Sequence, residues 1–260
     1  MAAPGLHHYF ENTTLLITHY NRSSSLERLL QTFRDYNCIF GDIVVSDDGS
    51  KPEHVRNLRA LKKEFSFRLL TSPENRGLGH NINKGQAAVK TPYTLYVQED
   101  FVPTPEFTGR FQDALDMMET ESRWDLITFY AYIRYPYLKP YKHGFSEKLC
   151  KPWYTNYKKI YAYTDHPHLR RSSFLQKFGN YAEGIKGDKT EYKMCVSFIQ
   201  KKGKGLFYND FQNLFLQKNS SEEPSTMTRS SWTQNSNMAI ALIRDLYRQV
   251  KYNYDILFSK

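Results

Sequence analysis

Two pairs of carboxylates directly follow apolar segments of the sequence, and each pair could take part in chemistry. Asp47 and Asp48 end the run DIVVSDD, and Glu99 and Asp100 end the run TLYVQED. Carboxylate oxygens bind Mg²⁺ or Mn²⁺, which in turn bridges phosphate oxygens, and they also accept hydrogen bonds from a ribose or a base. For the first pair a structural role is the alternative, because Asp48-Gly49 is a common turn sequence. Together, the pairs indicate a phosphate-binding metal site.

Histidines and arginines form a second group, in the run DHPHLRR. His166 and His168 have an i, i+2 spacing that metal ligands can adopt, but a proline between two histidines is more typical of a loop. We therefore expect these histidines to contact an acceptor or a diphosphate rather than zinc. Arg170 and Arg171 could pair with phosphates, or one of them could face solvent.

The elements that would position these side chains alternate along the first part of the chain. Apolar runs rich in β-forming residues predict strands, and the segments between them have the apolar spacing of helices. The predicted strands cover residues 14–18, 42–46, 67–71 and 94–97. This alternation predicts an α/β fold with a mostly parallel central sheet, in which functional residues gather at the carboxyl ends of the strands. The loop SPENRGLGHN also follows a strand and opens a helix, whose N-terminus favours anions.

The second half of the chain is less regular. We expect a strand at residues 126–129 and an irregular segment at 134–157. Three helices are expected after it, at residues 172–178, at 188–201 and from 235 onward. The last of these helices is amphipathic. Ser50 and Glu53 have capping-box spacing, so we expect Ser50 to cap the helix that follows the second strand.

Composition bounds the class of protein. With 260 residues, of which 40% are hydrophobic, the chain fits one large domain. Its three cysteines lie far apart without a CxxC pair, which argues against a disulfide framework or a zinc site and suits a reducing compartment. The sequence contains no apolar run long enough to span a membrane and no secretory leader. We therefore expect a cytoplasmic protein.

Positive charge is concentrated in one segment of the chain. Of the net charge of +9, residues 134–177 carry +8, because ten Lys and Arg residues stand there against Glu147 and Asp165. The segment also contains seven tyrosines and Trp153. It could contact nucleic acid, an anionic membrane surface or a phosphorylated substrate, or it could be a solvated basic face. No recognition-helix, RNP or zinc motif accompanies it, so we expect no nucleic-acid partner.

The order of the motifs resembles that of the family 2 glycosyltransferases, which are inverting enzymes with the glycosyltransferase-A fold. The series is LLITHYNR, IVVSDDGS, ENRGLGHNINKG and YTLYVQED followed by Val102-Pro103, with RRSSFLQKFGNYAEG and GDKTEY much later. The resemblance spans residues 14 to 192 and implies a nucleotide-diphosphate sugar as donor, with UDP as the expected nucleotide. It implies a donor-binding half at residues 1–130 and an acceptor-binding half of the same domain at residues 131–225. A C-terminal helical extension follows at residues 226–260.

The resemblance implies a donor site at the ends of the first two strands. Thr18, Tyr20 and Arg22 would contact the nucleotide, and Asp48 would bind the uracil edge. The third motif supplies architectural residues that pack a helix beneath the donor, namely Asn75, Gly77, Asn83 and Gly85.

The metal motif departs from the family pattern. The family has D-x-D, whereas this chain has Gln98-Glu99-Asp100. The resemblance implies that Asp100 binds Mn²⁺ or Mg²⁺ together with the diphosphate. Gln98 can hydrogen-bond a ribose but has no charge, and Glu99 compensates if the loop shifts by one residue. Metal dependence is therefore expected with fewer charged ligands than in a D-x-D enzyme.

The resemblance also implies a catalytic base in GDKTEY, the segment whose carboxylate deprotonates the acceptor hydroxyl. Asp188 matches that carboxylate, and Glu191 is the reserve candidate. A structural role is the alternative, because Asp188 and Glu191 have capping-box spacing. Both roles can coexist at the start of one helix.

The resemblance as a whole implies a metal-dependent hexosyl- or N-acetylhexosaminyltransferase, as in the synthesis of cell-surface polysaccharide or lipopolysaccharide. The expected acceptor is a glycan or a lipid-linked glycan, with negative charge that would suit residues 134–177, and peripheral contact with the inner face of the membrane would accompany it. Two alternatives stay open. One is a nucleotidyltransferase, although the GxGxR-type loop of those enzymes is absent, and the other is a degenerate transferase domain that binds carbohydrate or acts as a scaffold.

Overall fold

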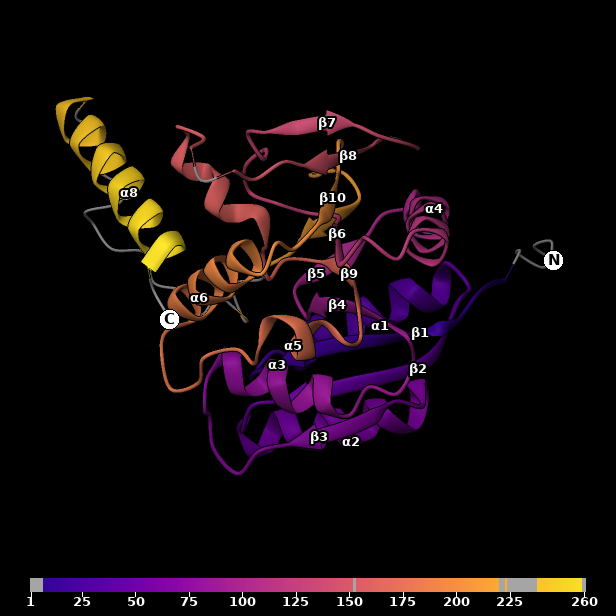
Figure 1. Cartoon of the computed structure of the whole chain (residues 1–260). Coiled ribbons are helices and arrows are strands. Elements are labelled where there is room, and N and C mark those ends of the chain that lie inside the picture. Colours follow the sequence, from indigo (N-terminus) through magenta and orange to yellow (C-terminus); the bar gives the residue numbers. More distant parts are fainter. Residues whose placement is uncertain (1–6, 152, 220–222, 224–237, 259–260) are drawn as a thin grey trace.

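The computed structural model describes residues 7–151, 153–219, 223 and 238–258 (Figure 1). Its strands are β1 (His8–His19), β2 (Cys38–Asp47), β3 (Arg68–Thr71), β4 (Tyr93–Gln98), β5 (Phe101–Pro103), β6 (Leu126–Thr128), β7 (Leu138–Pro140), β8 (Phe145–Lys148), β9 (His168–Arg171), β10 (Gly205–Tyr208) and β11 (Phe215–Gln217). Its helices are α1 (Ser23–Asp35), α2 (Pro52–Phe65), α3 (Leu78–Ala87), α4 (Phe107–Thr120), the 3₁₀ helix η1 (Tyr157–Ala162), α5 (Phe174–Phe178), α6 (Gly187–Gln200) and α8 (Met238–Phe258).

One mixed sheet organises the described part of the chain, with strand order β3-β2-β1-β4-β9-β6-β10-β8-β7. Strands β3, β2, β1 and β4 are mutually parallel, as the alternation of elements predicts. The register pairs His19 with Asp47 across β1 and β2, and Thr18 with Gln98 across β1 and β4. The carboxyl ends of these three strands therefore meet at one edge of the sheet. The α/β prediction is confirmed.

Strand β9 lies between β4 and β6 and runs antiparallel to both. His166 and Pro167 lie in a loop, as the proline between the histidines favours, and β9 begins at His168. The sequence analysis did not predict this strand, because the polar side chains of a buried strand hide its pattern. Arg170 is fully buried and donates hydrogen bonds to Gln86 and Tyr181. Arg171 donates to backbone carbonyls that include that of Trp124. Both arginines therefore stabilise the interior, and the expected phosphate pairing of Arg170 is excluded by its burial.

Residues 134–157, expected to be irregular, contain the antiparallel pair β7 and β8. Both strands are short, and β8 pairs on its other side with β10, which comes much later in the chain. The pairing therefore depends on a partner that local sequence does not reveal.

Helices cover both faces of the sheet, and alternating residues of each strand supply the two cores (Figure 1). On β1, Leu15 and Ile17 pack with side chains of α1, α2 and α4, whereas Leu16 packs with side chains of α3, α5 and α6. Close packing explains Gly85 on α3, because a Cβ there would lie 2.6 Å from Cδ1 of Leu16. The third motif is thus architectural, as expected.

The expected capping boxes do not form. Lys51 is the N-cap of α2, and the Ser50 hydroxyl donates to Asp47 instead. Lys186 is the N-cap of α6, whose first turn contains Asp188 without a side-chain cap. In the first case a buried carboxylate competes more strongly for the hydroxyl than the helix end does.

The basic segment 134–177 does not form one surface. Lys148, Lys159 and Arg170 are buried among internal partners. Lys142 and Lys177 form ion pairs with carboxylates of other segments. Only part of the +8 therefore reaches solvent, so charge in the sequence overstates the positive field of this region. Among the described residues, no helix is both long and apolar enough to cross a bilayer.

Candidate active site

The predicted donor-side residues lie at the carboxyl ends of β1 and β4. Thr18 is buried near the end of β1, and its hydroxyl lies 3.0 Å from that of Tyr96 on β4. Tyr20 and Arg22 lie between β1 and α1, and Gln98 is the last residue of β4. The structure thus brings these side chains to one edge of the sheet.

His19 is a buried side chain of this edge that the sequence analysis did not single out. Its Nδ1 lies 2.8 Å from Oδ1 of Asp47, and its Nε2 accepts a hydrogen bond from the backbone N–H of Arg22 at 3.2 Å. Burial raises the pKa of Asp47, but hydrogen bonds from His19 and Ser50 outweigh it and hold the pKa below its usual value. The ionised Asp47 orients His19, which in turn fixes the turn that carries Arg22. The signal in the sequence is a histidine at the end of the first predicted strand, while the Asp47-Asp48 pair follows the end of the second.

Asp48 holds the loop that follows β3. Its carboxylate oxygens accept hydrogen bonds from the backbone N–H groups of Arg76, at 3.1 Å, and Gly77, at 2.7 Å. Gly49 is needed beside it, since its φ is +70° and a Cβ would lie 2.2 Å from the backbone of Glu74. Asp48 thus has a structural role, and its contact with uracil stays a prediction.

Arg22 and Asp100 form the charged centre of the site. Arg22 Nη1 lies 3.1 Å from Oδ2 of Asp100, and both side chains are largely buried. Gln217, on β11, donates from Nε2 to the same oxygen at 2.8 Å and accepts a hydrogen bond from the Tyr132 hydroxyl at 2.9 Å. Asp100 is therefore fixed from two sides, by the guanidinium of Arg22 and the amide of Gln217.

Glu99 differs from Asp100 in its electrostatics. Burial, followed by the charge of Asp100, raises the pKa of Glu99 to about 8, although Arg22 opposes the shift. At neutral pH Glu99 is therefore mostly protonated and is not a second charged ligand in this arrangement. Its substitution for the missing aspartate of D-x-D stays a prediction.

A second cluster, Asp165, His166 and Glu191, faces the same region. One potential ligand atom from each side chain lies within 4.8 Å of the others. The backbone N–H of Asp165 donates to Oε1 of Glu191 at 3.3 Å. Burial raises the pKa of both carboxyls, and the charge of Asp100 adds to the shift of Asp165. The cluster and Asp100 thus interact electrostatically. They come from segments far apart in the sequence, since Asp100 precedes β5, the first two members of the cluster precede β9, and Glu191 lies on α6.

Aromatic rings surround His166. Tyr132 meets its ring edge-on with centroids 4.5 Å apart, and Tyr130 and Phe101 lie at 5.5 Å and 5.9 Å. Burial lowers the pKa of His166 to about 4, so the imidazole is neutral at physiological pH. Tyr132 is exposed, and its ring offers a flat apolar face of the kind on which sugars stack.

Asp188 is exposed in the first turn of α6, where its Oδ1 accepts the hydrogen bond of the Lys189 N–H at 2.8 Å. Its charge contributes to the raised pKa of Glu191. The two candidates for the base therefore differ in environment, since Glu191 points into the buried cluster and Asp188 faces solvent.

The donor set fits a divalent cation. Asp100 is buried, and its charge acts on Asp165 in the cluster of two carboxyls and one neutral imidazole. Carboxylate oxygens suit Mg²⁺ and Mn²⁺, and imidazole adds a ligand that Mn²⁺ accepts more readily. Arg22 already neutralises one oxygen of Asp100, so a metal there would share this carboxylate with the guanidinium.

The chain after β11 returns across the start of α1. The Glu223 carboxylate accepts hydrogen bonds from the backbone N–H groups of Ser24 and Ser25, each at 2.9 Å, and its backbone carbonyl accepts one from Arg22 Nη2 at 2.9 Å. Asn219 accepts a further bond from Arg22. This carboxylate caps α1 from almost two hundred residues away, which no local pattern predicts.

We expect Glu223→Gln to lower the free energy of unfolding by about 1–2 kcal/mol at neutral pH, because the charged cap of a buried helix end is lost. Burial raises the pKa of Glu223, but the hydrogen bonds from Ser25 and Ser24 outweigh it and lower the pKa. A lowered pKa stabilises the fold above the unfolded-state value, and this contribution disappears as pH falls through the folded-state value. Urea unfolding at neutral and acidic pH measures both effects. Glu27→Gln, at an exposed position of α1, is the control; equal losses in the two variants would contradict the assignment.

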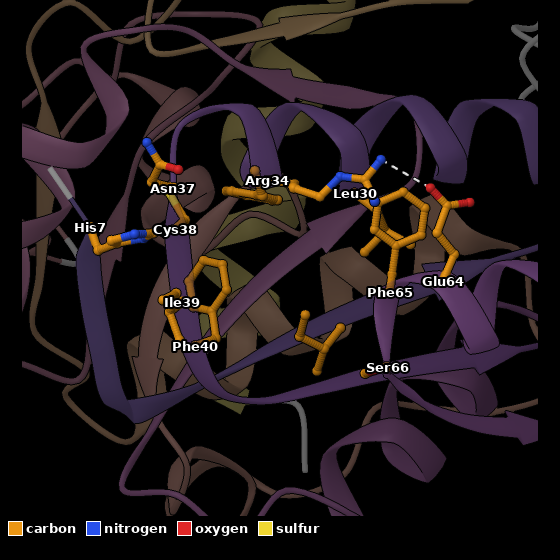
Figure 2. Close-up of a pocket in the computed structure, with 12 residues that line it drawn as sticks. His7, Leu30, Arg34, Asn37, Cys38, Ile39, Phe40, Glu64, Phe65 and Ser66 are labelled. Atoms are coloured by element: carbon orange, nitrogen blue, oxygen red, sulfur yellow. Dashed lines mark ion pairs between the residues drawn. The ribbon is translucent and has the colours of Figure 1, made fainter. Parts of the chain in front are cut away.

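A hollow elsewhere on the surface is not part of this site. It lies between the ends of α1 and α2 and the start of β2, and its wall includes the ion pair of Arg34 with Glu64 (Figure 2). The amino end of β2 is about 30 Å from the carboxyl end that carries Asp47. Burial raises the pKa of Cys38 in this wall to about 12, so its thiol is unreactive.

Comparison with known proteins agrees with this arrangement. The sequence profile of glycosyl transferase family 2 matches residues 14–177. No match is found among curated protein sequences. The solved structure of TarS 1-349 from S. aureus in complex with UDP-GlcNAc is similar with a TM-score of 0.63 and 15% identity, over 94% of this chain and 71% of that chain. A longer TarS chain is similar with a TM-score of 0.59 and 15% identity, over 80% of this chain and 37% of its own length.

A second protein shares the architecture. The mannosyltransferase PcManGT from Pyrobaculum calidifontis, solved with GDP-Man and Mn²⁺, has a TM-score of 0.52 and 12% identity, over 81% of this chain and 59% of that chain. At these identities the likeness establishes the fold, which is the glycosyltransferase-A architecture that the motifs imply.

Proposed function

The chain belongs to glycosyl transferase family 2, and from this premise we propose that it transfers a hexosyl or N-acetylhexosaminyl group from a UDP-sugar to a hydroxyl of a glycan or lipid-linked acceptor, with inversion. The observation that carries the proposal is the ion pair of Asp100 with Arg22 beside a buried carboxyl cluster at one edge of the sheet. Such an edge can hold a diphosphate and remove a proton from an acceptor.

On the donor side, we assign the nucleotide to the ends of β1 and β2. Thr18 and Tyr20 would contact the nucleoside, and Asp48 would accept a hydrogen bond from the base while it keeps its loop in place. Arg22 would pair with the diphosphate, because a guanidinium matches phosphate oxygens well. UDP-GlcNAc and GDP-Man in the two similar structures show that this architecture accepts different nucleotides, so the choice of UDP rests on the motifs alone.

A divalent metal is part of the proposal. Asp100 would hold Mn²⁺ or Mg²⁺, and Gln98 would bind the ribose. The bound cation supplies Lewis-acid stabilisation of the charge that develops on the leaving diphosphate. Arg22 and Gln217 fix the orientation of the Asp100 carboxylate.

We propose Glu191 as the base, with Asp188 as the alternative that matches the family motif. Glu191 and Asp165 share a buried site, so the pair retains a proton at a pH where a single exposed carboxyl would have lost it. A carboxylate with a raised pKa is a stronger base toward a hydroxyl. The acceptor ring would lie against Tyr132, on the side of the pair, and its hydroxyl proton would pass to Glu191 as the new glycosidic bond forms.

Thermal denaturation with ligands tests this function. We expect UDP or UDP-GlcNAc to stabilise the fold, and more so with Mn²⁺; a ligand at 100 times its Kd adds about 2.7 kcal/mol. GDP-mannose and metal alone are the controls. No stabilisation by any nucleotide, with or without metal, would refute the donor site. Stabilisation without transfer to any acceptor would favour the degenerate, carbohydrate-binding alternative.

A further inference from the structure

Helix α8 packs on the domain through one of its faces. Ile256 is buried against α6, and Asp255 accepts a hydrogen bond from the Tyr192 hydroxyl. Asn253 accepts a bond from Nζ of Lys159 at 2.6 Å, and Gln249 donates to the backbone carbonyl of Tyr154 at 3.1 Å. These three polar side chains of α8 are therefore directed toward the domain, whereas those of Asp245 and Lys251 stay 48% and 41% exposed.

The opposite face of α8 is entirely apolar. Seven residues of 243–258 are more than half exposed, and all are hydrophobic or aromatic, which we call the α8 stripe: Ile243, Leu246, Tyr247, Val250, Tyr254, Leu257 and Phe258. Each is at least 56% exposed. Figure 1 shows α8 at the outer margin of the molecule. An ordinary surface helix has the reverse arrangement, with its charges facing water, so the stripe indicates an apolar partner.

Residues 224–237, which precede α8 outside the described part, are a poor cover for the α8 stripe by composition, since Met227 and Trp232 are their only large apolar residues.

Charge and aromatic side chains beside α8 favour a lipid surface. Trp153 is 72% exposed in the loop whose Tyr154 carbonyl binds α8. Nζ of Lys151 lies 5.4 Å from the centroid of the Trp153 ring. Exposed tryptophan and tyrosine, with lysine beside them, are the residues that settle at the boundary between lipid headgroups and acyl chains. The net charge of +9 attracts the whole chain to an anionic surface.

We propose that the α8 stripe and Trp153 bind an anionic lipid surface, with α8 lying in the plane of the interface. The apolar side chains insert below the headgroups, while Lys151 and the basic surface interact with lipid phosphates. The proposal is independent of sugar transfer, because it concerns a face that contains none of the candidate site residues.

Vesicle co-sedimentation of the full chain tests the proposal, with vesicles of phosphatidylcholine alone or mixed with phosphatidylglycerol. We expect binding to the mixed vesicles, weakened by salt. The double variant Leu246→Gln/Val250→Gln should bind the mixed vesicles with an affinity at least about tenfold lower than that of the wild type, because two inserted side chains are lost. The matched control Tyr9→Gln/Ile39→Gln alters two exposed apolar residues at the other end of the molecule and should bind as the wild type does. Thermal denaturation checks that both double variants are folded.

A Trp153→Phe variant locates the contact. Quenching by brominated lipids, measured in a Trp232→Phe background, should be present with Trp153 in place and mostly lost in this variant, since the remaining Trp124 is fully buried. Failure of the wild type to bind mixed vesicles at low salt would overturn the proposal. Equal binding by the stripe variant and the wild type would also overturn it. Self-association that the stripe variant abolishes, without vesicle binding, would assign the stripe to a second copy instead.

Discussion

Asp100→Asn should reduce kcat/KM for sugar transfer by about 10²- to 10³-fold, the loss typical when one group that stabilises transition-state charge is removed. The substitution keeps the shape of the side chain but removes the negative charge that Arg22 and Gln217 hold in place at 3.1 Å and 2.8 Å. A neutral amide is a poor metal ligand, and it leaves Arg22 without its buried partner. We therefore expect the apparent affinity for Mn²⁺ to fall together with the rate.

Initial rates measured across a Mn²⁺ series at saturating donor test this prediction. Gln98→Ala is the matched control, because Gln98 lies on the same turn but contributes no charge, and we expect a much smaller loss. A loss for Gln98→Ala as large as that for Asp100→Asn would mean that the motif is shifted by two positions. Unchanged metal dependence in Asp100→Asn would exclude Asp100 as the metal ligand.

Glu191→Gln should lower kcat by about 10²- to 10⁴-fold while UDP still stabilises the fold as it does in the wild type, because a general base acts in the chemical step and not in donor binding. Burial raises the pKa of Glu191, with a smaller contribution from the charge of Asp188, and outweighs the hydrogen bonds from Thr164 and Asp165 that lower it. Since the base must be ionised, kcat should fall as the pH drops through this raised value, above the range of an ordinary glutamate. A pH profile of kcat measures where that fall occurs.

Asp188→Asn is the comparison that distinguishes the two candidates for the base. Asp188 is exposed, and its charge raises the pKa of Glu191, so its removal should shift the acid limb of the profile to lower pH and leave most of the rate. If Asp188→Asn abolishes transfer and Glu191→Gln does not, the motif match identifies the base and the buried cluster has another role.

Local sequence determined the donor half of the molecule. The apolar runs before Asp47 and Asp100 predicted parallel strands, and parallel strands joined by helices must end at one edge of the sheet. Asp48 and Asp100 therefore could be assigned to one region without any tertiary information. The family resemblance implied a packing role for the third motif, and Gly85 of α3 does permit close packing against Leu16.

Only the tertiary structure decided the rest of the site. Strand β9 joins the sheet between β4 and β6, and this central position buries Arg170. The pattern of polar and apolar residues along the segment does not reveal that position. Glu191 meets Asp165, and Glu223 meets the start of α1, across long stretches of chain. The protonation of Glu99 depends on how many atoms exclude water around it. Sequence periodicity reports the contacts within an element, whereas desolvation and long-range pairing exist only once the elements have packed. The sequence therefore located the edge of the sheet that carries Asp48 and Asp100, and the fold selected the groups around it.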